Sequence, residues 1–199
     1  MKIEIRWHGR GGMGAKTAAL LLGEAMMYQD KYIQVFPEYG PERRGAPVVA
    51  FTKISDEEIK GHYGITSPDV IVIFDDTLLT SPKIREGIKR DTIVLVNTSL
   101  SIEEIKKKLG IECNLKVVDA SKISREIMGK DLPNTPMLGA LMKILNILPF
   151  EDFLKAVEER LKTKFREEIV RKNIEAIKRA YEEVKWNLNH GKICQKVRL

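Results

Sequence analysis

The stretch "GRGGMGAKT", residues Gly9–Thr17, joins an apolar strand-like run, "KIEIRW" at Lys2–Trp7, to a helical pattern at Ala15–Tyr28. Its glycines follow the GxGxxG spacing. Glycine permits a tight turn and a close approach of the backbone to a ligand, and the start of a helix offers unpaired N–H groups to an anion. The stretch therefore predicts a strand–turn–helix unit with a phosphate as its natural guest.

Two familiar nucleotide sites match this loop incompletely. An NAD site needs an acidic residue at the end of the second strand, about 20 residues further on, and there the chain has Pro37 and Glu38, followed by a loop rich in Pro, Gly and Arg. A Walker loop is one residue shorter than Gly9–Thr17, and one extra residue rotates Lys16 by about 100° around the helix. The loop alone leaves three interpretations open: a phosphate site, a free-standing NAD- or ATP-binding protein, or a tight turn without a ligand.

Further along the chain, apolar runs alternate with helical patterns. Strands are predicted at 2–7, 32–36, 48–54, 70–74, 92–96 and 115–119, and helices at 15–28, 83–88, 101–109, 121–128, 135–148, 150–161 and 165–188. The connection 36–48 has no helical pattern, whereas a parallel crossover usually contains a helix. We therefore expect an α/β protein with three α/β/α layers, a mixed, mostly parallel sheet of about six strands, and a helical C-terminal part.

The domain organisation expected from these patterns is simple. Residues 1–189 are predicted to form one domain whose helical part begins near residue 134, and residues 190–199 a C-terminal arm. The last helix is expected to bury one apolar stripe, made of Phe165, Ile169, Ile177, Tyr181, Val184 and Leu188. The Ser101 side chain is expected to cap the helix at 101–109, with Glu104 completing a capping box.

Composition and charge exclude several classes of function. The 199 residues are 43% hydrophobic, and the net charge of +6 is spread thinly along the chain, so nucleic-acid binding is not expected. No apolar run approaches the roughly 20 residues of a membrane helix, and no signal peptide opens the chain, so we expect a cytoplasmic location. Cys113 and Cys194 lie far apart without a CxxC spacing, which predicts free thiols and neither an iron–sulfur nor a zinc site.

Three separate motifs, in order along the chain, carry a resemblance to a known family. They are "HGRGGMGAKTAALLLGEA" (residues 8–25), "FPEYGPERRGAPVVAF" (36–51) and "LPNTPMLGAL" (132–141). From about residue 3 to residue 185 the chain resembles the 2-oxoacid:ferredoxin oxidoreductase family, most closely the gamma subunits of its pyruvate-using members. One position departs from the pattern, because the family commonly has Gln where this chain has Met13.

The resemblance implies an α/β/α subunit of a larger enzyme. That enzyme converts pyruvate and coenzyme A to acetyl-CoA and CO2 and passes the electrons to ferredoxin. Alpha, beta and delta subunits carry thiamine diphosphate, Mg²⁺ and the iron–sulfur clusters, so this chain is expected to bind no cofactor alone and to be inactive alone. The sequence agrees, because it lacks both the CxxCxxC runs that clusters need and a GDG…N stretch for thiamine diphosphate. Branched-chain 2-oxo acids, 2-oxoglutarate and indolepyruvate remain open as substrates.

The resemblance also assigns candidate site residues. The loop is expected to cradle the phosphates of coenzyme A, with Arg10 adding charge; its members are Gly9, Arg10, Gly11, Gly12, Met13 and Gly14. Arg43 and Arg44 lie on a proline-flanked loop, where guanidinium groups suit a phosphate or a carboxylate. An ion pair between subunits is the alternative role for these two arginines.

Other polar residues near the predicted strand ends have weaker functional signals. His8 borders the glycine loop and could contact a phosphate or a substrate carbonyl, although a hydrogen-bonded structural role is the more common one. Asp75 and Asp76 follow a buried strand, but neighbouring residues on an extended chain point in opposite directions, so one of them is expected to cap the next turn. Asn134 and Thr135 are expected to begin a helix.

Overall fold

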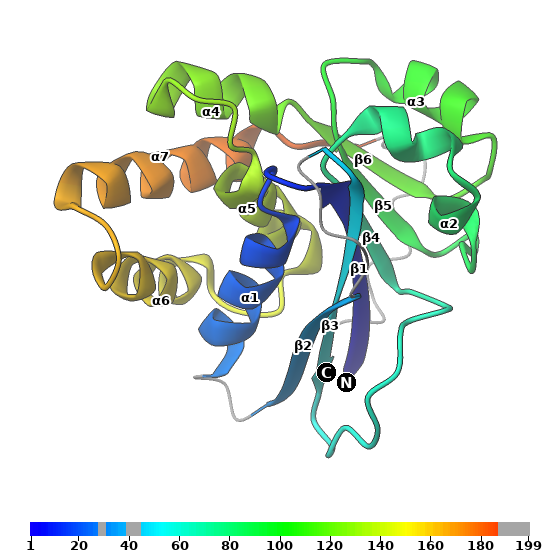
Figure 1. Ribbon diagram of the computed structural model, residues 1–199, viewed down its shortest axis with the longest axis horizontal. Helices are drawn as coiled ribbons and strands as arrows, with labels where there is room; N and C mark the ends of the chain where they lie inside the picture. Colours follow the sequence, from blue (N-terminus) through cyan, green and yellow to red (C-terminus); the bar gives the residue numbers. More distant parts are fainter. Residues whose placement is uncertain (28–30, 39–44, 187–199) are drawn as a thin grey trace.

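A computed structural model describes residues 1–27, 31–38 and 45–186 and places one seven-stranded sheet at the centre of the protein (Figure 1). The strand order is β2-β3-β1-β4-β5-β6-β7. The strands are β1 (Lys2–Arg10), β2 (Tyr32–Glu38), β3 (Pro47–Ser55), β4 (Val70–Ile73), β5 (Ile93–Asn97), β6 (Asn114–Val118) and β7 (Lys185–Trp186).

The sheet is mixed, as the sequence predicted. Strands β1, β4, β5 and β6 are parallel neighbours, whereas β3 is antiparallel to both β1 and β2, and β7 is antiparallel to β6. The connection in which the sequence predicts no helix, between β2 and β3, therefore joins an antiparallel pair. All six predicted strands are present, and five of the seven observed strands run in one direction, which confirms the expected fold class.

Helices cover both faces of the sheet (Figure 1). On one face lie α1 (Ala15–Met26), α4 (Ala120–Met128), α5 (Asn134–Leu145), α6 (Phe150–Lys162) and α7 (Glu167–Glu183). On the other lie the short 3-10 helix η2 (Asp76–Thr80), α2 (Pro82–Arg85) and α3 (Ile102–Leu109). These helices and the sheet make the three layers.

Successive side chains of strand β1 point alternately to the two faces of the sheet. Ile3, Ile5 and Trp7 enter the larger hydrophobic core beneath α1 and α5, whereas Arg6 and His8 point to the opposite face. On that face, the loop between β3 and β4 folds over β2, where His62 stacks on Phe36 with 5.1 Å between ring centroids. One face of β1 is consequently apolar, whereas the other bears charged and polar side chains.

The backbone of helix α5 packs directly against the backbone of α7 at Gly139. A Cβ atom added to Gly139 would lie 2.0 Å from the carbonyl oxygen of Ile177. This glycine belongs to the third motif, "LPNTPMLGAL", so part of that motif serves close packing between helices.

The C-terminal part differs in detail from the prediction. Helix α7 ends at Glu183, and Lys185–Trp186 form β7, so the predicted helix to residue 188 is too long. The predicted apolar stripe is also wrong at its start, because Phe165 and Ile169 are 47% and 43% exposed, whereas Val170 is buried. Leu188 and the predicted arm at 190–199 lie outside the described residues. The capping box of Ser101 and Glu104 is confirmed.

Candidate functional site

The glycine loop turns the chain from β1 into α1 at the carboxyl end of the strand. Gly14 is the N-cap of α1 and has a left-handed backbone with φ 80°, and Gly12 has φ 100°. The N–H of Met13 donates to the carbonyl of Arg10 at 3.1 Å, which closes the turn. Only glycine adopts such angles without strain, so the positions of these two glycines are set by the backbone.

The N-terminus of α1 has no cap from a side chain. Gly14 provides none, and the first turn contains no acidic residue. In contrast, Ser101 and Glu104 cap α3 with reciprocal hydrogen bonds. The first N–H groups of a helix lack intrahelical acceptors, and the partial positive charge at the N-terminus of α1 therefore remains available to an anion.

The three sequence motifs meet at this loop. The N–H of Gly11 donates to the carbonyl of Ala46 at 2.9 Å, and the N–H of Gly45 donates back to the carbonyl of Gly11 at 3.1 Å. A Cβ atom on Gly14 would lie 2.8 Å from the Cβ of Asn134, which begins α5 as predicted. The glycine loop, the second motif and the third motif thus form one local structure.

A groove of about 660 Å³ opens beside the loop. Its walls come from the loop, the first turn of α1, and the ends of β2 and β3: Arg10, Gly11, Gly12, Gly14, Ala15, Lys16, Thr17, Pro37, Glu38, Val48, Val49 and Ala50. The side chains of Lys16 and Thr17 are exposed. Arg43 and Arg44 lie outside the described residues, although Gly45, which follows them, is bonded to the loop.

Arg10 is held within the protein. Its Nε donates to the Oδ2 of Asp75 at 2.5 Å, and its two Nη atoms donate to the Oγ1 of Thr77 at 2.8 Å and the carbonyl of Gly45 at 3.2 Å. Burial acts to raise the pKa of Asp75, but hydrogen bonds from Thr77 and Arg10 lower it overall. Arg10 therefore fastens the glycine loop to the end of β4.

The acidic pair after β4 behaves as expected from an extended chain. Asp75 caps η2 by accepting a hydrogen bond from the N–H of Thr77, whereas Asp76 accepts one from the hydroxyl of Thr98 at 2.5 Å. The contact between Asp75 and Arg10 was not predicted. Because Arg10 ends β1 and Asp75 follows the neighbouring parallel strand β4, strand order could have suggested it.

Met13 has a packing role in this structure. Its side chain is partly buried and packs against the larger hydrophobic core. Cys113 is partly buried, and burial raises its thiol pKa to about 11, as expected for an unreactive free thiol. Cys194 lies outside the described residues.

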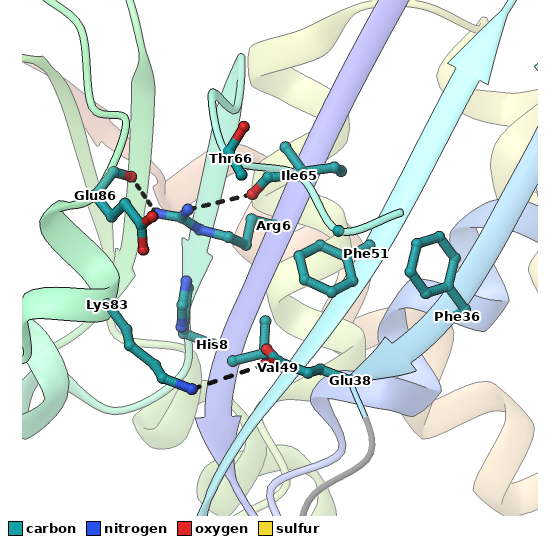
Figure 2. Close-up of a pocket in the computed structure, with 11 residues that line it drawn as sticks. Arg6, His8, Phe36, Glu38, Val49, Phe51, Ile65, Thr66, Lys83 and Glu86 are labelled. Carbon is teal, nitrogen blue, oxygen red and sulfur yellow. Dashed lines mark hydrogen bonds and ion pairs between the residues drawn. The ribbon is translucent and has the colours of Figure 1, made fainter. Parts of the chain in front are cut away.

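A second pocket, of about 330 Å³, lies on the other face of β1 (Figure 2). Its walls are Arg6, His8, Phe36, Glu38, Val49, Phe51, Gly64, Ile65, Thr66, Lys83 and Glu86. The sequence had suggested a hydrogen-bonded structural role for His8. In the structure His8 is 4% exposed, and its buried Nε2 has no hydrogen-bond partner among the described residues.

Two charged side chains surround His8 (Figure 2). The Nη atoms of Arg6 donate to the backbone carbonyls of Ile65, Ile84 and Glu86. Burial, with a smaller effect of Arg6 and Lys83, lowers the pKa of His8 to about 3, so its imidazole is neutral near pH 7. Alternation along β1 could have predicted that Arg6 and His8 share a face, but not what surrounds them.

The described parts of the chain contain neither a metal-binding cluster nor a helix that could span a membrane. Within residues 1–27, 31–38 and 45–186, no group of three or more His, Cys, Asp or Glu side chains could hold a metal ion. None of the described helices combines the length and apolar character needed to cross a bilayer.

Comparison with known proteins assigns the chain to a family. Residues 4–183 match the family described as pyruvate ferredoxin/flavodoxin oxidoreductase. The chain is 48% identical to pyruvate synthase subunit PorC of Thermotoga maritima, over 92% of this chain and 94% of that protein. It is 44% identical to the pyruvate/ketoisovalerate oxidoreductases common subunit gamma of Thermococcus litoralis, over 91% and 96% of the two chains.

A solved structure agrees with this assignment. The crystal structure of pyruvate oxidoreductase subunit PORC from Thermotoga maritima superposes with a TM-score of 0.81 at 46% identity, covering 92% of this chain and 97% of that chain. The chain therefore belongs to the pyruvate ferredoxin/flavodoxin oxidoreductase family.

Proposed function

We propose that this chain is the gamma subunit of a multi-subunit pyruvate:ferredoxin oxidoreductase. The complex converts pyruvate, coenzyme A and oxidised ferredoxin to acetyl-CoA, CO2 and reduced ferredoxin. Family membership supports this proposal, as does the similarity to PorC over nearly the whole of both chains. The alternative of a free-standing NAD- or ATP-binding protein is set aside, because the relatives are oxidoreductase subunits.

The contribution of this subunit is to place coenzyme A and to help assemble the complex. The uncapped N-terminus of α1, opening into the groove where the three motifs meet, is the observation that carries the placement role. Phosphates of the coenzyme accept hydrogen bonds from the free N–H groups of the loop and of the first helical turn. The cradle is made of Gly9, Arg10, Gly11, Gly12, Met13 and Gly14.

The charged side chains at this cradle have different roles. Arg10 fixes the loop. The neighbouring carboxylate of Asp75 reduces the electrostatic attraction between Arg10 and the phosphates of the coenzyme. Lys16 adds a cation from the first turn of α1, because its exposed side chain lines the groove. Arg43 and Arg44 bind the coenzyme or a neighbouring subunit. Their joint replacement by Ala is expected to weaken assembly or turnover while leaving the melting temperature nearly unchanged.

The chemistry takes place on other subunits. Alpha, beta and delta subunits are proposed as partners, carrying thiamine diphosphate, Mg²⁺ and the iron–sulfur clusters, with ferredoxin as the electron acceptor. Residues 1–189 act as one domain, and the complex works in the cytoplasm.

A second substrate class is supported by the names of four relatives. The Thermococcus litoralis protein is named a subunit common to pyruvate and ketoisovalerate oxidoreductases, and it is 44% identical to this chain. We infer that this subunit can also serve a complex acting on branched-chain 2-oxo acids, since a gamma subunit need not contact the side chain of the substrate.

Reconstitution tests the proposed function. The chain, co-expressed with its partner subunits, is expected to co-purify with them and to be required for pyruvate- and coenzyme-A-dependent reduction of a viologen dye. The chain alone should be colourless and inactive. An iron–sulfur absorption band in the isolated polypeptide, or full activity of the partners without it, would overturn the proposal. Assays with 2-oxoisovalerate, 2-oxoglutarate and indolepyruvate decide the substrate class.

A further inference from the structure

The pocket over His8 contains the buried guanidinium of Arg6, whose pKa is lowered by burial and, to a smaller extent, raised by the more distant charges of Glu86 and Glu38. Arg6 is 4% exposed, and among the described residues no carboxylate forms an ion pair with it. Its Nη atoms donate only to backbone carbonyls, and its Nε–H has no acceptor there. Burying an unpaired charge is costly, so proteins usually pair such a group with an anion.

Besides Arg6, one other lysine or arginine, Lys83, lines the pocket. Lys83 stands at the rim, where its Nζ lies 3.7 Å from the carboxylate of Glu38 in an exposed pair. Burial lowers the pKa of His8, and the charges of Arg6 and Lys83 add a smaller lowering.

The remaining walls of the pocket are mostly apolar and suit a ligand with an apolar part. Phe36, Phe51, Val49 and Ile65 are apolar, and they face the polar group formed by Arg6, His8 and Lys83 (Figure 2). Glu38 and Glu86 also line the pocket, but both are exposed. A volume of about 330 Å³ is at the small end of ligand sites.

We propose that this pocket binds a small organic carboxylate with an apolar body. The carboxylate lies against His8 and Lys83, within the field of Arg6, and the apolar body packs on Phe51 and Val49. Neutral His8 donates a hydrogen bond from one ring nitrogen, and Lys83 exchanges its exposed contact with Glu38 for the guest. The site is on the opposite face of β1 from α1. It adjoins the glycine groove, because Glu38 and Val49 line both, but the proposal does not rest on the coenzyme role of the glycine loop.

Nuclear magnetic resonance of the full chain tests this site. The imidazole resonances of His8, assigned with His8→Gln, are followed while isobutyrate or 2-oxoisovalerate is added, with isobutanol and inorganic phosphate as separate probes. A saturable shift with both carboxylates and with neither control probe is expected. The two carboxylates also distinguish a general carboxylate site from one that requires a 2-oxo group.

Two lysine variants sharpen the test. Lys83→Met is expected to weaken carboxylate binding by about three- to fivefold, as for one exposed charge, whereas Lys130→Met, which removes an exposed lysine beyond α4, should leave it unchanged. Absence of a saturable shift, an equal response to isobutanol or phosphate, or equal weakening by the two variants would overturn the proposal. Failure of coenzyme A placement at the glycine loop would leave these outcomes unaffected.

Discussion

The side chains of Arg6 and Arg10 lie on the same face of β1, but they differ in burial and in hydrogen-bond partners. Arg10, at the glycine groove, is partly exposed and is matched by Asp75, Thr77 and a backbone carbonyl. Arg6, in the pocket over His8, is buried and bonded only to neutral carbonyls. At the groove the charge of Arg10 is thus satisfied within the protein and backbone N–H groups are left for a ligand, whereas in the pocket the charge of Arg6 has no ion-pair partner among the described residues.

This difference separates two ways of building an anion site. At the groove, specificity comes from backbone shape, because left-handed glycines and an uncapped helix present N–H groups in fixed directions. In the pocket, attraction comes from buried side chains, whose charges act strongly because little water screens them. Substitutions that change backbone shape should therefore affect the groove most, and changes in charge or pH should affect the pocket most.

The largest expected effect comes from Gly14→Ala at the groove. The methyl group would meet Asn134 at 2.8 Å, and φ 80° adds backbone strain. Together these are expected to lower the free energy of unfolding by about 2–4 kcal/mol, measured by urea unfolding. Gly110→Ala is the matched control, because it has φ 67° and open space around the Cβ. Equal losses in the two variants would show that the contact with Asn134 is unimportant.

Acid should affect the pocket through His8. Its pKa is about 3 in the folded protein, against an ordinary value of 6.5. Between these values the unfolded chain binds more protons, so the free energy of unfolding should fall as the pH falls below 6.5, by up to about 1.4 kcal/mol per pH unit. Above that pH the contribution is fully present.

Urea unfolding between about pH 7 and pH 5 measures this slope. His8→Gln should remove most of it, whereas His62→Gln, at an exposed histidine, should leave it unchanged. A slope that survives in His8→Gln would contradict the buried neutral imidazole, and with it the contrast between pocket and groove.

The smallest expected effect concerns the ion pair at the groove. Asp75→Asn removes the charge that faces Arg10, and because the pair is partly exposed, the loss should be about 0.5–1 kcal/mol. The difference between wild type and variant should shrink in about 1 M salt, where the Debye length is short. A loss that is insensitive to salt would mean that the hydrogen bonds of Asp75 to Thr77 dominate.

Much of the fold could be predicted from periodicity. Six strands could be predicted from short stretches of sequence, because apolar alternation is a local signal. The absence of a helical pattern between residues 36 and 48 is also a local signal, and it predicted a mixed sheet. Strand β7 could not be predicted, since two residues become a strand only by pairing with β6. The stripe of α7 was misplaced because Phe165 and Ile169 are apolar yet lie where no described element covers them.

The candidate site could be predicted only where a motif is local. The glycine loop and the helix starting at Asn134 were recognisable from spacing, and the structure brings them together. The contact of Arg10 with Asp75, and the enclosure of His8 by Arg6 and Lys83, depend on strand order and on loops far apart in sequence. Such long-range contacts leave no trace in the local sequence pattern.

The role of the glycine loop in placing coenzyme A is tested most directly by Gly12→Ala in the assembled complex. No atom lies within 4 Å of the added Cβ in this chain, so the methyl group meets no neighbouring side chain, and it acts by intruding on a ligand and by straining the loop at φ 100°. We expect the KM for coenzyme A to rise by about tenfold, as for weakening one hydrogen bond to a phosphate, with the KM for pyruvate unchanged and Gly110→Ala without effect. An unaltered KM for coenzyme A in a normally assembled Gly12→Ala complex would contradict the cradle and leave "GRGGMGAKT" as a turn between strand and helix.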